Sequence, residues 1–151
     1  MAERNVFEFR NLRTAEGDES PMFSASLYRD GRKIGRVRDT GTGGEPFVEI
    51  ATKSDRDAFA RWAKETASAE ALEHPKYAAQ WAREEAVGRL YEAAMEKRWL
   101  KRHCKTKTLF RPADHGDDAS WMTINHRFDE RVKAFIVQKY GADVRIANEE
   151  I

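Results

Sequence analysis

The most basic stretch of this 151-residue sequence runs from Lys97 to Arg111, and aromatic rings are interleaved with its charges. The side chains in it that could contact a ligand are Lys97, Arg98, Trp99, Lys101, Arg102, Lys105, Lys107 and Arg111. No acidic residue interrupts the stretch. Cations that pair with phosphates, beside rings that stack on bases, are typical of a surface that binds a nucleic-acid backbone. The alternative is the C-terminal end of a helix, where the helix dipole also favours cations.

The stretch from Phe23 to Ile50 carries a second group of cations and has the pattern of a β-hairpin, a glycine-rich turn and a third strand. Asp30 and Gly31 supply the positive backbone angles that a tight turn needs. Burial of the apolar set decides which residues face inward, and it predicts core positions for Phe23, Leu27, Ile34 and Val37. The exposed face is then expected to carry Arg29, Arg32, Lys33, Arg36 and Arg38.

Two other motifs could hold a ligand, but their surroundings favour ordinary turns. The glycine cluster from Gly41 to Gly44 lacks the following helix that a phosphate-binding loop requires. The loop from Asp114 to Asp118 holds several carboxylates and His115, yet no pair has the spacing that places two metal ligands on one helical face. His103 and Cys104 are adjacent and point apart, which makes them a poor catalytic pair. We therefore expect no enzymatic activity, no metal site and no cofactor.

Composition narrows the class of protein. The length suits a single domain over residues 1–151. Lysine and arginine total 27 against 26 aspartates and glutamates, so the net charge is +1 and any charged partner must be recognised by a local patch. The one cysteine, Cys104, excludes an internal disulfide and suits a reducing compartment. No signal-like or membrane-spanning apolar run occurs, so we expect a cytoplasmic protein that does not enter a membrane.

Periodicity and capping residues predict the elements that must position these side chains. In the N-terminal part we expect a strand from Val6 to Arg10, a loop from Asn11 to Pro21 and, after the hairpin, a helix that Ser54 caps and that continues to about Ala69. A long helix is expected from Lys76 to about His103. Gly88 lies inside this helix and costs about 1 kcal/mol relative to alanine, a penalty that a close helix–sheet contact would offset.

The C-terminal part has the pattern of a second hairpin and a further helix. We expect strands from Lys105 to Arg111 and from Ser120 to His126, then a helix that Asp129 or Asn125 caps and that ends at Tyr140 before Gly141. A short strand from Val144 to Ile146 and a frayed acidic tail from Asn148 to Ile151 would follow. The expected fold class is therefore α+β: an antiparallel sheet with two central helices, and a C-terminal β-hairpin plus helix that completes the same sheet.

Three segments together resemble a pattern found in small uncharacterised proteins of phages and prophages. They are FSASLYRDGRKIGRVRDTGTGGE in the hairpin region, KTLFR after the long helix, and VKAFIVQKYGADV near the C-terminus. The resemblance carries over no catalytic or binding residue. It implies a short accessory gene on a mobile element. Products of such genes often bind and inhibit host machinery, and anti-CRISPR and other anti-defence factors are among them.

Two functional hypotheses follow from these observations. The first is a small phage or mobile-element interaction protein that binds and inhibits a host protein or nucleoprotein complex. The alternative is a DNA- or RNA-binding module that uses Lys97 to Arg111 together with the hairpin arginines. Which hypothesis is favoured depends on whether the two basic groups meet on one surface.

Overall fold

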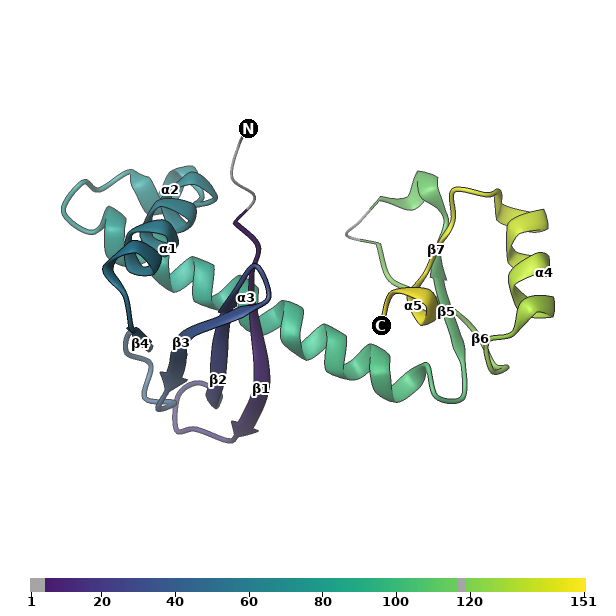
Figure 1. Ribbon diagram of the computed structural model, residues 1–151, viewed down its shortest axis with the longest axis horizontal. Helices are drawn as coiled ribbons and strands as arrows, with labels where there is room; N and C mark the ends of the chain where they lie inside the picture. The colour runs from purple at the N-terminus through teal and green to yellow at the C-terminus, as the bar shows by residue number, and fades with distance from the viewer. Residues whose placement is uncertain (1–4, 117–118) are drawn as a thin grey trace. The chain divides into compact units, whose positions relative to one another are not determined.

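The computed structural model describes residues 5–116 and 119–151 and shows a mixed chain of helices and strands (Figure 1). The α+β class expected from the sequence is confirmed. The chain forms two compact units, Met1–Ala94 and Met95–Ile151, and the boundary between them falls inside helix α3 (Ala78–His103). Each unit has a sheet of its own, and the expectation of a single domain stays a prediction. No described helix is both long enough and apolar enough to cross a membrane.

Unit 1 is built on a four-stranded antiparallel sheet whose strands are neighbours in chain order. The strands are β1 (Phe7–Ala15), β2 (Met22–Arg29), β3 (Arg32–Asp39) and β4 (Phe47–Ile50). Asp30 and Gly31 turn β2 into β3 with φ angles of 51° and 79°, as the sequence predicts. The expected loop from Asn11 is wrong in its first part, because β1 continues to Ala15. The strand has a β-bulge between Arg10 and Arg13, with Asn11 at φ 56°. The bulge breaks the alternation of inward and outward side chains, but pairing with β2 resumes at Arg13.

Three helices follow the sheet in the chain: α1 (Lys53–Glu65), α2 (Ala69–Leu72) and α3. Thr52 caps α1, so the prediction of Ser54 as the cap is wrong by two residues. The reason is a reciprocal pair: the Thr52 hydroxyl accepts a hydrogen bond from the Asp55 amide and donates one to the Asp55 carboxylate. α1 also ends at Glu65, before the predicted Ala69, and Ser68 there caps the separate helix α2.

The core of unit 1 lies between one face of the sheet and the helices α1 and α3. Its larger buried members are Phe7, Phe9, Phe23, Leu27, Ile34, Val37, Phe59, Val87 and Leu90. The four core positions predicted for the hairpin, Phe23, Leu27, Ile34 and Val37, are all buried and are therefore confirmed. The predicted close contact at Gly88 is wrong. Gly88 is exposed, and a Cβ placed on it would meet no atom within 4 Å.

Unit 2 contains a second, separate sheet of three short strands in the order β6, β5, β7. Its elements are β5 (Thr108–Arg111), the 3-10 turn η1 (Ala113–His115), β6 (Met122–Ile124), α4 (Glu130–Tyr140), β7 (Arg145–Ile146) and α5 (Ala147–Glu150). The expectation that this hairpin completes the first sheet is wrong, because β7 occupies the open side of β5. Asp129 is the cap of α4, and Gly141 follows its end at φ 98°, as predicted.

The C-terminal tail is folded, which corrects the prediction of frayed residues from Asn148. The Asn148 side chain donates hydrogen bonds to the carbonyl oxygens of Lys107 at 2.8 Å and Cys104 at 3.3 Å, and accepts one from the Leu109 amide at 3.0 Å. These bonds satisfy the backbone where α3 ends and β5 begins. The strand itself starts at Thr108 and not at the predicted Lys105, because the amides of Thr106 and Lys107 donate to the His103 carbonyl in a turn that follows α3.

Candidate nucleic-acid interface

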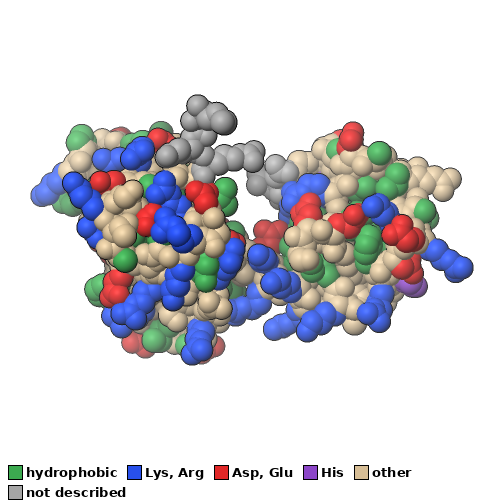
Figure 2. Space-filling view, viewed as in Figure 1, with side chains coloured by type: hydrophobic (Ala, Val, Ile, Leu, Met, Phe, Trp, Pro, Cys, Tyr) green, Lys and Arg blue, Asp and Glu red, His purple; other side chains and the backbone are tan. Residues whose placement is uncertain are grey.

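The outer face of the unit 1 sheet, the face opposite the core, is rich in cations. The strand register places Arg10 opposite Ser26, Arg13 opposite Ser24, and Arg38 opposite Phe47. The basic side chains on this face are Arg10, Arg13, Lys33, Arg36 and Arg38, and its acidic side chains among the described residues are Glu8 and Glu49. Lys and Arg side chains are numerous over this sheet in the space-filling view (Figure 2). The face has a local excess of positive charge although the chain is nearly neutral.

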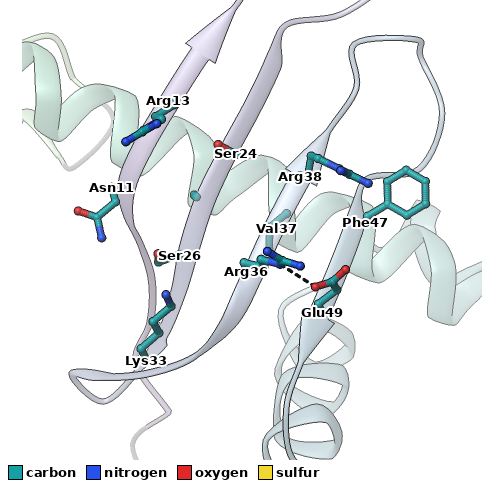
Figure 3. A pocket seen from close by; sticks show the side chains of 11 residues that line it. Asn11, Arg13, Ser24, Ser26, Lys33, Arg36, Val37, Arg38, Phe47 and Glu49 are labelled. Atoms are coloured by element: carbon teal, nitrogen blue, oxygen red, sulfur yellow. Dashed lines mark hydrogen bonds and ion pairs between the residues drawn. The ribbon is translucent and has the colours of Figure 1, made fainter.

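A shallow hollow of about 390 Å³ crosses this outer face (Figure 3). Arg13 on β1 borders it on one side, and Arg36 and Arg38 on β3 border it on the other. Ser24 and Ser26 of β2 lie between them and form the floor, because their side chains are short. The hollow therefore combines a polar floor with cationic sides.

Some of these cations are already paired and others are not. Arg36 donates to Glu49 at 2.7 Å, and Arg10 donates to Glu8 at 2.5 Å. Arg13, Lys33 and Arg38 are exposed and form no ion pair with any residue that the structure describes. These three side chains are the ones free to meet a negatively charged ligand.

Two aromatic rings share the outer face with the cations. The Arg10 guanidinium lies 4.3 Å from the centre of the Tyr28 ring, and the Arg38 guanidinium lies 5.4 Å from the centre of the Phe47 ring. Phe47 is 56% exposed, so most of its ring is accessible to a ligand. Figure 3 shows Arg38 extended toward this ring at the border of the hollow.

Arg29 and Arg32 do not belong to this face. Both side chains donate to the Asp55 carboxylate, each with a closest distance of 3.0 Å. The Arg32 side chain is 63% exposed, as predicted, whereas the prediction that Arg29 is exposed is wrong. The Arg29 side chain is only 15% exposed. Of the five predicted hairpin cations, the structure thus brings Lys33, Arg36 and Arg38 together and assigns Arg29 and Arg32 to a structural ion cluster.

The Asp55 carboxylate is buried and ionised. Hydrogen bonds from Arg32 and Thr52 outweigh its burial, and with a smaller contribution from Arg29 they lower the pKa of Asp55 to about 2. The cluster joins the turn between β2 and β3 to the first turn of α1. It positions the strands that carry the outer face.

The stretch from Lys97 to Arg111 forms the last turns of α3, a turn and strand β5 in unit 2. Positions four residues apart share a side of the helix, which groups Lys97 with Lys101, Arg98 with Arg102, and Trp99 with His103. The Trp99 and His103 rings lie 4.3 Å apart, and Trp99 is 45% exposed. Lys97, Lys101, Arg102 and Lys105 are exposed, whereas Arg98 and Lys107 are partly buried.

Arg111 is a structural residue, which corrects its prediction as a binding cation. Its side chain is 12% exposed, donates to Glu96 at 3.3 Å, and stacks 4.0 Å from the centre of the Trp121 ring. The Trp121 indole N–H also donates to Glu96, at 2.9 Å. The guanidinium is therefore committed to fixing the end of β5 on α3.

Sequence reasoning missed the residues that complete the outer face, namely Arg10, Arg13, Ser24, Ser26, Tyr28 and Phe47. The sequence predicts a loop at Arg13, because the bulge at Asn11 interrupts the strand pattern. The alternation of side chains in the strand after Pro46 is the signal that predicts an outward Phe47. Val48 and Ile50 pack on the core, so Phe47 must point to the opposite face.

The two other candidate motifs are the glycine cluster from Gly41 to Gly44 and the loop from Asp114 to Asp118. The turn predicted at Gly41 to Gly44 is observed, and the Gly41 carbonyl accepts hydrogen bonds from the amides of Glu19 and Ser20. Among the described residues, no group of three His, Cys, Asp or Glu side chains is arranged to hold a metal ion. Asp117 and Asp118 of the predicted loop lie outside the described residues. Burial raises the pKa of the Cys104 thiol, which disfavours the reactive thiolate.

Comparison with known proteins adds no relative: no family model, curated protein or solved structure matches this chain.

Proposed function

We propose that this protein is a binding protein rather than an enzyme, and that unit 1 contacts the phosphate backbone of a nucleic acid with the outer face of its sheet. The single observation that carries the proposal is the hollow between Arg13 and Arg38, which has a floor of serine side chains. Around it lie the exposed Arg13, Lys33 and Arg38, which form no ion pair with a described residue. Cations and hydroxyls are the groups that most often contact phosphate oxygens.

The unpaired cations set the expected size of the effect. Each neutralised phosphate releases counterions and contributes about −0.7 to −0.9 to the slope of log K against log salt. Contacts from Arg13, Lys33 and Arg38 would therefore give a slope of about −2 to −3. The ion pairs of Arg10 and Arg36 reduce the contribution of these two residues, because a phosphate must compete with an existing carboxylate.

The test is fluorescence anisotropy of labelled DNA and RNA oligonucleotides with the full chain at several salt concentrations. We expect binding at low salt that weakens with this slope. The variant R13Q/K33Q/R38Q should lose most of the affinity and most of the salt dependence. The matched control K53Q/R61Q/K64Q removes the same charge from α1, away from the outer face, and should bind nearly as the wild type does. Absence of binding at low salt would refute the proposal.

A second candidate function is the binding and inhibition of a host protein or nucleoprotein complex in the cytoplasm, as the resemblance to phage and prophage proteins implies. One observation favours it: Trp99 is 45% exposed near the end of α3, and Arg102 lies three residues further along the helix. Tryptophan and arginine are the residue types most often found at the energetic centre of protein interfaces. Affinity capture from a bacterial lysate tests this function. A partner retained by the wild type and lost with W99A supports it, and no stoichiometric partner contradicts it.

A further inference from the structure

We infer that the outer face of the unit 1 sheet takes a single nucleic-acid strand in preference to a duplex, with the backbone over Ser24 and Ser26 and a base stacked on Phe47. The inference rests on the proposed function, because it names the form of nucleic acid that this same surface accepts. It follows from the width of the face, the shape of the hollow and the exposure of one ring.

The width of the sheet disfavours a duplex ligand. Neighbouring strands lie about 4.8 Å apart, so four strands extend over about 14 Å between the outermost backbones. The major groove of B-DNA is about 12 Å wide and admits a helix or a two-stranded ribbon. The hollow is lined by residues of all four strands, from Asn11 on β1 to Phe47 and Glu49 on β4. A four-stranded face is too wide to enter that groove, so a duplex could contact the face only from outside the groove.

The hollow has the dimensions of a single backbone. Arg13 and Arg38 belong to strands on either side of β2, about 10 Å apart across the sheet. Phosphates lying over β2 can be reached by the guanidinium groups from both sides. The hydroxyls of Ser24 and Ser26 face the same space and can donate to phosphate oxygens. A large side chain at either serine would fill the floor.

Phe47 supplies the platform that base stacking requires. The ring is 56% exposed, borders the hollow, and has the Arg38 guanidinium 5.4 Å from its centre. A base that leaves a strand over β2 can stack on this ring, whereas the bases of a duplex are already stacked on one another. Stacking on aromatic side chains is a recurring feature of proteins that bind single strands.

Phe135 on α4 of unit 2 makes a matched control for this ring. It is 53% exposed and has the Lys139 ammonium 5.8 Å from its centre, so residue type, exposure and neighbouring charge all resemble those of Phe47. It differs in lying on a helix and in not being a lining residue of the hollow. The change F135L therefore removes an equivalent exposed ring without touching the proposed site.

The experiment compares a labelled single strand with a hairpin duplex that contains the same sequence, each as DNA and as RNA, at one low salt concentration. We expect the single strand to bind at least about tenfold more tightly than the duplex. F47L should weaken single-strand binding by at least about fivefold and leave the salt slope unchanged, since no charge is removed. F47W should restore the affinity, and F135L should leave it unchanged. Circular dichroism spectra that match the wild type show that each variant is folded.

The outcomes separate this inference from the proposed function. Binding of the duplex as tightly as the single strand, or an F47L variant that binds like the wild type, overturns the inference and leaves nucleic-acid binding in place. Absence of binding to every oligonucleotide overturns both. A difference between the DNA and RNA arms identifies which single-stranded polymer the hollow accepts.

Discussion

Asp55 shows how a single residue can hold two arginines that the sequence places with the other hairpin cations. Its carboxylate is buried, and a buried charge is stable only when it is paired and hydrogen-bonded. Arg29, Arg32 and Thr52 all donate to it. The turn between β2 and β3 and the start of α1 are therefore held by one anion, and the two arginines act in stability.

The first prediction concerns this carboxylate. The variant D55N should unfold with a free energy lower by about 2 kcal/mol at neutral pH, because it removes the buried carboxylate that pairs with the poorly exposed Arg29 cation. Urea denaturation measures the change. D57N removes an exposed carboxylate two residues away and should alter the free energy by under about 0.5 kcal/mol. Equal effects of D55N and D57N would show that the cluster does not stabilise unit 1.

The second prediction is the acid dependence of the same cluster. Asp55 has a pKa of about 2 in the folded chain against 3.8 for the ordinary side chain, so the unfolded chain binds more protons between these values. The stabilisation is complete above about pH 4 and disappears as the pH falls toward 2. The difference in unfolding free energy between the wild type and D55N should shrink over this window. A difference that stays constant from pH 6 to pH 2 would contradict the assignment.

At the scale of the elements, helix α3 contains a glycine that lowers its stability. Gly88 lies inside it, is exposed, and has open space where a side chain would be. No packing therefore offsets its conformational freedom. The contrast is Gly41, which is buried, has φ +74°, and lies where a Cβ would come within 2.7 Å of the Gly17 Cα.

The third prediction compares these two glycines. G88A should raise the free energy of unfolding by about 0.5–1 kcal/mol, because alanine loses less backbone freedom in a helix. G41A should lower it, because the side chain is strained at positive φ and overlaps backbone atoms. Thermal and urea denaturation report both changes. Destabilisation by G88A would contradict this prediction.

The fourth prediction concerns the attachment of helix α5. N148A removes three hydrogen bonds that join the C-terminal tail to the end of α3 and the start of β5. It should lower the stability of unit 2 by about 1–3 kcal/mol, since backbone groups of Lys107 and Leu109 lose their partner. Hydrogen exchange at the Leu109 amide should accelerate. E149A removes only the exposed pair with Lys133 and should leave that exchange rate nearly unchanged.

At the scale of the molecule, charge is distributed unevenly although the total is +1. One group of exposed cations lies on the sheet of unit 1, and another lies at the end of α3 in unit 2. The outer face of the sheet adds a hollow and a polar floor to its charge. The end of α3 has cations where the helix dipole favours them in any case.

The fifth prediction concerns which of these two groups of cations contributes to the proposed nucleic-acid binding. The triple change on the sheet, R13Q/K33Q/R38Q, should reduce the magnitude of the salt slope by about 2 to 3. The triple change at the helix end, K97Q/K101Q/K105Q, should reduce it by less than 1. Anisotropy titrations at four or more salt concentrations measure both slopes. An equal loss in both variants would instead show that the ligand contacts both groups.

Local patterns in the sequence determine much of this protein. The hairpin at Asp30 and Gly31, its four core residues and the end of α4 at Gly141 are correctly predicted, and the cap is Asp129, one of the two residues that the sequence allows. Each depends on a few neighbouring residues and on whether they are apolar, can cap, or tolerate a positive φ. The α+β class follows from the same local signals.

Only the tertiary structure decided which cations share a surface. Arg29 and Arg32 resemble Arg36 and Arg38 in the sequence, yet Asp55, more than twenty positions away, forms ion pairs with the first two. Glu96 and Trp121 do the same for Arg111. The bulge in β1 brings Arg13 opposite Ser24, and β7 completes a second sheet where one sheet was expected. The physical reason is that these contacts join residues that are far apart in the sequence. Folding, and not the local sequence pattern, decides which partner a charged side chain or a strand meets.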